Sequence, residues 1–263
     1  MIAEKPKTDK SMERSSKAVW LDCLRASVTV LVVAHHSSLA YTNFARFDPG
    51  RYLASTAPIV DTVRWGFFDY AENFNDVFFM SLMFFLSGLL VLPGVARHGK
   101  IGYLRGRAKR LGLVFLLAVG LLMPLAYYPS YLQAGGSMSY LAYWFREFPK
   151  DGLPPGPPWF LWMLLLFDSI AVASLPALKS ICAHAAKLFE SWEGKPGKAF
   201  LTIFLTPPLY FQTSRMLPYF AWFAFGALMG AKGPDHGLVS RQGKLARRWP
   251  AWIAAWFMRY CGC

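Results

Sequence analysis

The sequence is poor in charged residues and in cysteine. Only 16% of its 263 residues are charged, whereas a soluble domain usually carries about 25%. Two of the 4 cysteines, Cys23 and Cys182, lie in or beside apolar stretches and are predicted to be small core residues. The other two, Cys261 and Cys263, form a single C-x-C without the second ligand pair of a structural zinc site. No bound metal is therefore predicted.

The motifs of several enzyme classes are missing as well. The chain has no G-x-S-x-G nucleophile elbow and no H-E-x-x-H zinc motif. Residues 194–198, GKPGK, lack the spacing and the Ser or Thr of a phosphate-binding loop. A net charge of +13 would point to nucleic acid in a soluble protein, but no basic and aromatic recognition motif accompanies it. Nucleic acid is therefore not a predicted partner.

Long hydrophobic runs, by contrast, dominate the sequence. It is 55% hydrophobic and 17% aromatic, and runs of about 20 apolar residues have the length of a transmembrane helix. The predicted membrane helices are residues 18–41, 74–95, 111–131, 159–182, 199–211 and 216–231, and a seventh that begins at 249 and stops with the chain at 263. We therefore predict an all-α polytopic transmembrane helix bundle, with a basic cytoplasmic tail at 1–17 and a transmembrane domain at 18–263.

The positive charges alternate along this layout. The predicted inside segments hold five, six, four and five Lys or Arg, in the order 1–17, 97–110, 179–198 and 232–248. The predicted outside segments hold three, two and one, in the order 42–73, 129–158 and 212–215. Because cytoplasmic loops carry the excess of positive charge, the N-terminus is predicted to be cytoplasmic. The first apolar run is too long for a cleavable signal peptide, so it is predicted to remain as the first helix.

The first apolar run carries ionisable residues, which are costly inside a membrane and call for a reason. On a helix, Arg25 and His36 are eleven steps apart, which places them within roughly 20° of one face and about 16 Å apart along the axis. Asp22 and Thr29 fall on the same stripe, and His35 points away from it by most of a right angle. Arg25 suits a phosphate or carboxylate, Asp22 can orient it, and His36 suits proton transfer near neutral pH.

Simpler interpretations of this stripe stay open. Arg25 with Asp22 can serve as an interfacial anchor that reaches the headgroups, and a membrane histidine is often an interhelical hydrogen-bonding residue. In the first predicted outer loop, an aromatic and acidic cluster suits contact with a hydroxyl-rich sugar, although an ordinary interfacial loop is the alternative. The cluster consists of Trp65, Asp69, Glu72, Asn73 and Asp76.

The first helix resembles the opening helix of the acyltransferase family 3 membrane proteins, in which L-D-x-L-R is followed by His eleven positions after the Arg. The matching residues are Leu21, Asp22, Leu24, Arg25 and His36. The following residues, HSSLAY, resemble the glucans biosynthesis protein C branch, which is linked with succinyl transfer to periplasmic glucans. Phe84, Phe85, Ser87 and Gly88 resemble the family's F-F-x-S-G, and Arg107 and Arg110 match its basic third-helix start.

The resemblance covers most of residues 18–231 and departs from the family in two places. The residues PPWFLWMLLLF resemble a family segment that usually carries a His. In this chain Pro158 stands near the position of that His. The family usually has about ten helices, so the resemblance implies a chain that is truncated at its C-terminus, with six helices and part of a seventh present.

The resemblance implies a function and its partners. Such proteins are thought to move an acyl group, acetyl or succinyl in this branch, from cytoplasmic acyl-CoA to an extracytoplasmic carbohydrate. In this chain the implied catalytic residues are His36, Arg25 and Asp22, and the implied donor-binding residues are Arg25, Arg107 and Arg110. Acyl-CoA is a donor substrate and no cofactor is permanently bound. The implied location is the bacterial inner membrane, in several passes through the lipid bilayer.

Two other functions stay open at the level of sequence. A transporter or flippase of a glycan or a lipid-linked sugar would use broken helices around a midplane site, for which Pro207, Pro208 and Pro218 are the support. An inactive fragment is the third interpretation. Ordinary positive-inside topology is also an alternative to donor binding for the basic residues of 97–110.

Overall fold

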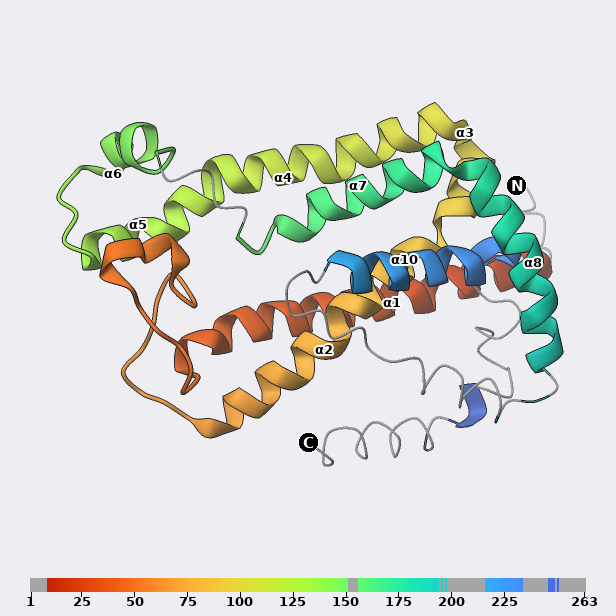
Figure 1. The fold of residues 1–263 in the computed structure, drawn as a ribbon, viewed down its shortest axis with the longest axis horizontal. Helices are drawn as coiled ribbons and strands as arrows, with labels where there is room; N and C mark the ends of the chain where they lie inside the picture. Colours follow the sequence, from red (N-terminus) through yellow and green to blue (C-terminus); the bar gives the residue numbers. More distant parts are fainter. Residues whose placement is uncertain are drawn as a thin grey trace, which may run out of the picture. The chain divides into compact units, whose positions relative to one another are not determined.

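The computed structural model describes residues 9–150, 156–193, 195, 197, 216–233, 246–248 and 250. The predicted segment 199–211 lies outside this part of the chain, as does 249–263 apart from residue 250. All regular structure in the described residues is helical, which confirms the all-α class (Figure 1). Contacts divide the chain into two compact units. The first is Met1–Phe79 with Ala126–Ser139, and the second is Met80–Leu125 with Tyr140–Cys263.

The first unit is built on α1 (Asp9–Ser38) and the start of α2 (Gly66–Leu89). The chain between them, with short 3-10 turns at Leu39–Tyr41 and Pro49–Ala54, folds back on the end of α1. The backbone N–H of Asp61 and the side chain of Arg64 both donate to the Ala40 carbonyl, at 3.0 and 2.7 Å. The predicted outer segment 42–73 is therefore an ordered loop followed by helix.

The described helices of the second unit follow in chain order. They are α3 (Val91–Arg107), a π-turn at Ala108–Gly112, α4 (Leu113–Leu117), a π-turn at Ala118–Leu122, α5 (Met123–Gln133, shared with the first unit), α6 (Tyr140–Ala142), a π-turn at Tyr143–Glu147, α7 (Trp159–Ala173), α8 (Leu175–Glu193), α10 (Met216–Met229), and 3-10 turns at Gly230–Lys232 and Ala246–Arg248. Within this unit α7 packs along α3 and α4 (Figure 1).

Within the described residues, the helices differ from the predicted segments in three main places. The basic stretch 97–110, predicted as a loop, is helical apart from a kink at Gly99, where φ is +68°. The segment 74–95 is divided, because α2 ends at Leu89 and α3 begins at Val91. Pro93 explains this division, since proline lacks the N–H that would continue the helix by bonding to the carbonyl of Leu89.

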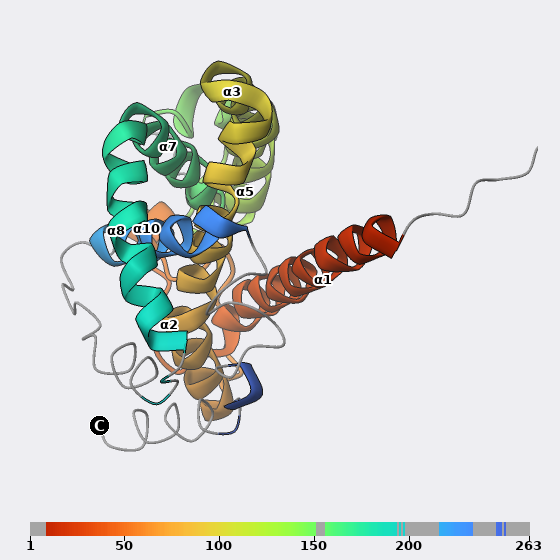
Figure 2. The ribbon, with the colours of Figure 1, turned by 90° about the vertical axis from the view of Figure 1, so that its right-hand side faces the viewer.

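The third difference is a corner inside the predicted segment 159–182. Helices α7 and α8 meet there at a bend of 81°, which Figure 2 shows from the side. Ser174 at the junction leaves the helical conformation, with φ −89° and ψ 18°. Pro176, two residues later, cannot donate the backbone bond that a straight helix would need.

Within the described residues, two helical stretches have the length and composition to cross a membrane. They are Val19–Tyr41, of 23 residues, and Val91–Gln133, of 43 residues. The bent pair Trp159–Ala173 and Leu175–His184 makes a third if it counts as one span, and Met216–Met229 is a shorter apolar helix. These apolar stretches are those of a membrane protein, and the complete set of passes and their orientation stay predictions.

An aromatic cluster forms the centre of the second unit. Phe84 is fully buried, and its ring lies 4.8 Å from Phe160, 5.0 Å from Tyr219 and 5.2 Å from Phe167, measured between centroids. Aromatic pairs at such distances contribute about 0.5–1.5 kcal/mol beyond the area they bury. The cluster therefore joins α2, α7 and α10.

Small residues let α2 and α10 touch through their backbones. A Cβ atom on Gly226 would stand 2.1 Å from the carbonyl oxygen of Phe85, and one on Gly88 would stand 2.0 Å from that of Phe223. Gly226 and Gly230 are spaced as G-x-x-x-G, a pattern that lets membrane helices approach closely. The contact requires glycine at these positions.

We expect Gly226→Ala to destabilise the protein by about 1–3 kcal/mol, because the added methyl group meets a backbone atom that cannot move alone. Gly120→Ala is the matched control, since nothing lies within 4 Å of its Cβ position. Thermal unfolding in detergent measures both variants. Equal unfolding temperatures for the two would contradict the close helix contact.

Candidate functional site

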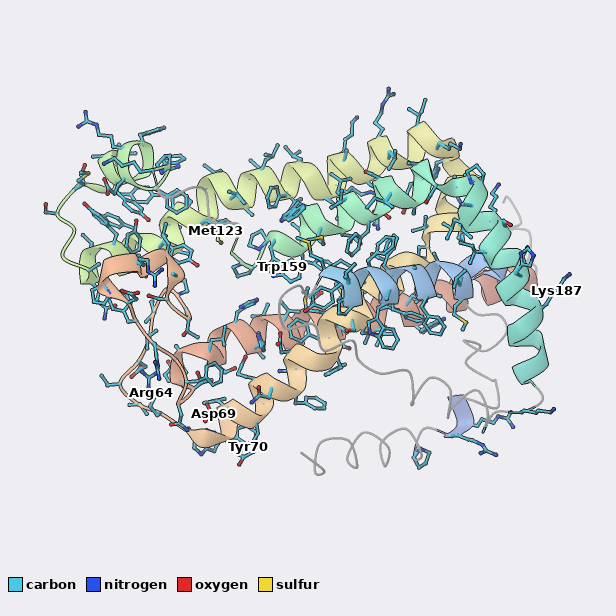
Figure 3. The ribbon with its side chains drawn as sticks, in the orientation of Figure 1. Arg64, Asp69, Tyr70, Met123, Trp159 and Lys187 are labelled. Atoms are coloured by element: carbon cyan, nitrogen blue, oxygen red, sulfur yellow. The ribbon has the colours of Figure 1, made fainter. Side chains whose placement is uncertain are left out.

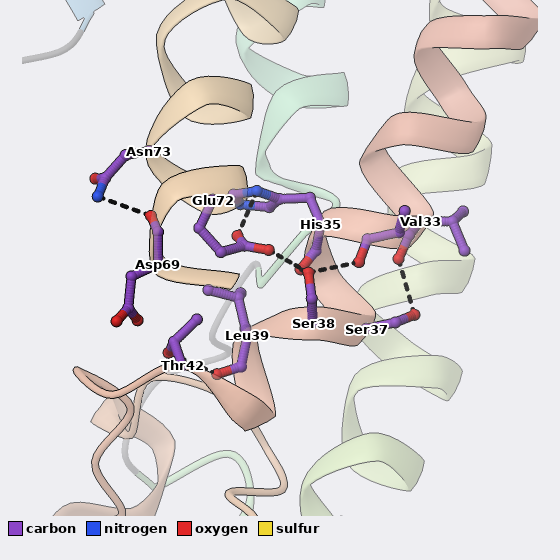
Figure 4. A network of polar contacts seen from close by, with 10 residues as sticks. Val33, His35, Ser37, Ser38, Leu39, Thr42, Asp69, Glu72 and Asn73 are labelled. Carbon is purple, nitrogen blue, oxygen red and sulfur yellow. Dashed lines mark hydrogen bonds and ion pairs between the residues drawn. The ribbon is translucent and has the colours of Figure 1, made fainter. Parts of the chain in front are cut away.

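A buried histidine and a buried glutamate meet in the first unit. Nδ1 of His35, in the last turn of α1, lies 2.5 Å from Oε2 of Glu72 in α2 (Figure 4). The two side chains are only 10% and 2% exposed. The two atoms are in close contact, without the alignment of a linear hydrogen bond. The Ser38 hydroxyl donates to the other oxygen of the Glu72 carboxylate.

The hydroxyls at the end of α1 also lie close to backbone carbonyls of the preceding turn. The Ser37 and Ser38 hydroxyls lie 2.8 and 2.9 Å from the carbonyls of Val33 and Ala34, one turn earlier. Such back-bonding satisfies a hydroxyl in an apolar helix. The helix then gives way to a 3-10 turn at Leu39, which leaves Ser38 and His35 facing α2.

The Glu72 carboxyl lies in an environment that disfavours its charge. Glu72 precedes the apolar run that begins at Phe74. Burial raises its pKa above the ordinary value, the hydrogen bond from Ser38 opposes this, and the nearby charge of Asp76 raises the pKa further. A carboxyl whose pKa is raised in this way is suited to exchange a proton with the histidine beside it.

His36, the histidine predicted from its distance to Arg25, lies beside this pair. It is exposed, and its ring packs edge to face with that of His35, with centroids 5.3 Å apart and planes at 82°. The His35 ring also contacts Phe79, at 5.1 Å. The structure therefore places an accessible histidine against a buried one that is held by a carboxylate.

The predicted stripe on α1 is largely exposed in the first unit. Asp22, Thr29 and His36 are exposed and Arg25 is half-buried. Arg25 Nη1 lies 4.0 Å from Asp22 Oδ1, and the Thr29 hydroxyl donates to the Arg25 carbonyl at 2.9 Å. The buried side of α1 is one residue away, at Leu21, Val28 and His35. The geometry brings Asp22 and Arg25 together, and His36 lies in the last turn of α1.

The acidic and aromatic cluster of the outer loop has two parts. Asp69 fixes the loop, because its carboxylate accepts bonds from the backbone and the side-chain amide of Asn43, at 2.8 and 2.6 Å. Trp65 and Tyr70 are 58% and 80% exposed, and Figure 3 shows Tyr70 near Asp69. Glu72 does not belong to the exposed part, since it points to His35.

A second polar group lies in the second unit around Asp168, which has no exposed surface. Arg107 Nε donates to one carboxylate oxygen of Asp168 at 2.5 Å, and the Tyr103 hydroxyl donates to the other at 2.8 Å. Arg107 Nη2 also donates to the Ser87 hydroxyl at 3.3 Å. The network joins α2, α3 and α7, and the Arg107 side chain is 17% exposed.

The two predicted donor-binding arginines of the second unit differ in their surroundings. Arg107 is engaged by Asp168 and Ser87, whereas Arg110 is exposed and its Nε donates to the Gly106 carbonyl at 3.2 Å. Arg110 thus has its guanidinium at the surface, whereas the Arg107 side chain is mostly buried. Asp168 was not predicted from the sequence, although a carboxylate in an apolar segment is a signal that sequence offers.

The second unit also holds a cavity of about 590 Å³ between α3, α8 and the end of α10. Its lining is mainly apolar, with the ammonium of Lys179 as a cation and the thiol of Cys182 beside it. The other lining residues are Leu92, Pro93, Val95, Ala96, Leu175, Ala183, Ala231 and Gly233. Across the described ranges, no group of three or more His, Cys, Asp or Glu side chains is placed to hold a metal ion.

Comparison with known protein families identifies the class of the chain. The family model described as an acyltransferase domain, that of acyltransferase family 3, matches residues 18–262. The chain therefore belongs to this family, and the family and the apolar helices together make it a membrane acyltransferase in general terms. No curated protein and no solved structure matches the chain.

Proposed function

We propose that the protein transfers an acetyl or succinyl group from cytoplasmic acyl-CoA to a hydroxyl of an extracytoplasmic carbohydrate, such as a periplasmic glucan. The observation that carries the proposal is the exposed imidazole of His36, beside a buried histidine–carboxylate pair, in a chain of this family. An exposed imidazole suits the removal of a proton from a sugar hydroxyl.

The chemistry divides between acceptor and donor. His36 takes the proton of the acceptor hydroxyl while the oxygen attacks the thioester carbonyl carbon. The carbon–sulfur bond then breaks, and the CoA thiolate leaves and takes up a proton. Arg25, oriented by Asp22, holds a negative group of the donor. In this proposal the exposed side chains of Trp65 and Tyr70 bind the sugar.

Residues of the second unit are also proposed to bind the donor. The predicted orientation puts 97–110 and 179–198 in the cytoplasm, where CoA is available. The guanidinium groups of the exposed Arg110 and of Arg107 suit the CoA phosphates, and the apolar cavity beside Lys179 suits the pantetheine arm and the acyl group. The lipid bilayer is the solvent of the helices.

The proposal is tested by thiol release from purified protein in lipid vesicles. Acetyl-CoA and succinyl-CoA are supplied in turn, with and without periplasmic glucan. The proposal predicts CoA release that depends on the glucan and saturates with it. Release of equal rate without glucan would show a thioesterase, and no release with either donor would favour a transporter.

Lys179 gives a separate prediction for the donor cavity. We expect Lys179→Ala to raise the KM for acyl-CoA about threefold to tenfold, because a phosphate loses one charge-assisted contact. The kcat should change less than about twofold. Lys187→Ala on the same helix is the control, since Lys187 does not line the cavity (Figure 3). Equal KM values for the two variants would remove the cavity from donor binding.

A further inference from the structure

The His35–Glu72 pair is the feature that the proposed transfer does not yet use. Both side chains are buried, and the two residues lie 37 positions apart in the sequence. Neither residue belongs to the stripe that Arg25 and His36 define. A buried pair of ionisable side chains is a weak source of stability, since well-packed apolar side chains of similar size often serve as well or better. Its place beside His36 therefore calls for a functional account.

The geometry connects the pair to His36 through ring contact. Glu72 faces Nδ1 of His35, and the His35 ring stands edge to face against the His36 ring at 5.3 Å. The Phe79 ring contacts His35 as well. The His35 ring is thus held by a carboxylate and an aromatic ring, and it presents a fixed surface to its neighbour.

The other charged groups near the pair do not replace Glu72. Ser38 binds the second oxygen of the Glu72 carboxylate, which aims the first at His35. The charge of Asp76, one turn further along α2, acts on both His35 and Glu72. Asp69 is engaged with Asn43, and Arg64 with the Ala40 carbonyl. Among the described contacts, Glu72 is the carboxylate that His35 touches.

We propose that Glu72 and His35 are positioning residues for His36, with Glu72 fixing the His35 ring and His35 fixing the orientation of the His36 ring. The carboxylate also supplies a negative charge near the imidazolium that His36 becomes when it takes a proton. The arrangement parallels the aspartate that orients a catalytic histidine in hydrolase triads, with one more ring between the carboxylate and the base. The inference rests on the proposed role of His36 in acyl transfer.

The kinetic test uses purified protein in vesicles and the glucan-dependent release of CoA. Glu72→Gln keeps the size of the side chain and removes its charge, and His35→Gln removes the ring. We expect each to lower kcat at least tenfold, with the KM for acyl-CoA and for glucan within twofold of wild type. The double variant should be no slower than the slower single variant, because residues that act as a unit are not additive.

Controls separate positioning from folding. Glu72→Asp should recover part of the kcat lost in Glu72→Gln, and Glu147→Gln, which changes a surface carboxylate paired with Lys150, should leave it unchanged. All rates are normalised to the amount of monodisperse protein. A kcat unchanged in Glu72→Gln, a loss confined to KM, or multiplied effects in the double variant would overturn the proposal.

A second measurement keeps the inference independent of the transfer reaction. In protein with 15N-labelled histidine, ring signals are assigned with His35→Gln and His36→Gln. We expect Glu72→Gln to move the ring signals of both His35 and His36 by more than a line width, and Glu147→Gln to move neither. Signals of His36 that stay in place would overturn the proposal, whether or not the wild-type protein transfers acyl groups.

Discussion

Replacing His36 by alanine is expected to lower glucan-dependent CoA release by about 10²- to 10⁴-fold, which is the contribution of a well-placed general base. The loss should appear in kcat, because the imidazole acts on the hydroxyl as it reacts and contributes little to holding either substrate. The exposed position of His36 means that its replacement leaves no cavity in the first unit.

The control for this variant is His98→Ala, which removes an exposed histidine in α3 outside the proposed machinery. We expect a kcat within twofold of wild type for it, and unchanged unfolding temperatures for both variants. A His36→Ala protein with normal kcat would remove His36 from the chemistry and shift the search for a base to His35.

Replacing Asp168 by alanine is expected to destabilise the protein by about 3–5 kcal/mol, the usual cost of breaking a buried ion pair from one side. Asp168 has no exposed surface, and its loss leaves the Arg107 guanidinium and the Tyr103 hydroxyl without their common acceptor. Thermal unfolding and the yield of monodisperse protein in detergent report this effect.

A double variant that removes the charges of both Arg107 and Asp168 is the comparison for Asp168→Ala. The pair Arg107→Leu with Asp168→Leu should unfold much closer to the wild-type temperature than Asp168→Ala alone, because no uncompensated charge remains. If Arg107 also binds the donor, the pair should still show a raised KM for acyl-CoA. An Asp168→Ala protein as stable as wild type would contradict the network around Asp168.

Hydropathy predicted where apolar helices lie better than where they end. The helix over 18–41 is present, and α10 (Met216–Met229) lies within the predicted 216–231. The stretch 97–110 was predicted as a loop because of its charge, yet Arg and Lys are good helix formers and the chain stays helical on both sides of Gly99. Charge predicts exposure to water or headgroups, and it does not by itself end a helix.

In the candidate site, contacts within one helix could be predicted from the sequence, whereas contacts between distant residues could not. The contact of Asp22 with Arg25 follows from the three-residue spacing on one helix, and the structure brings these atoms to 4.0 Å. The contacts of His35 with Glu72 and of Arg107 with Asp168 join residues far apart in sequence. Helical periodicity tells which residues share a face, but it does not tell which helix that face meets.

The sequence pattern therefore identified His36 and left His35 on the neighbouring face. In the structure that face is the buried side of α1. It meets Glu72, which belongs to the outer-loop cluster for which the sequence left open both a sugar contact and an ordinary interfacial loop. The proposed role of His36 thus comes from the sequence pattern, and the proposed support from His35 and Glu72 comes from the structure.

The most direct test of the account follows the acyl group itself. Purified protein in lipid vesicles is given acyl-CoA with an isotopic label in the acetyl or succinyl group, together with periplasmic glucan, and the glucan is then analysed by mass spectrometry. The account predicts glucan that carries the label in ester linkage, formed by the wild-type protein and not by His36→Ala. Label that remains on CoA or appears only as free acid, in the presence of folded protein, would contradict it.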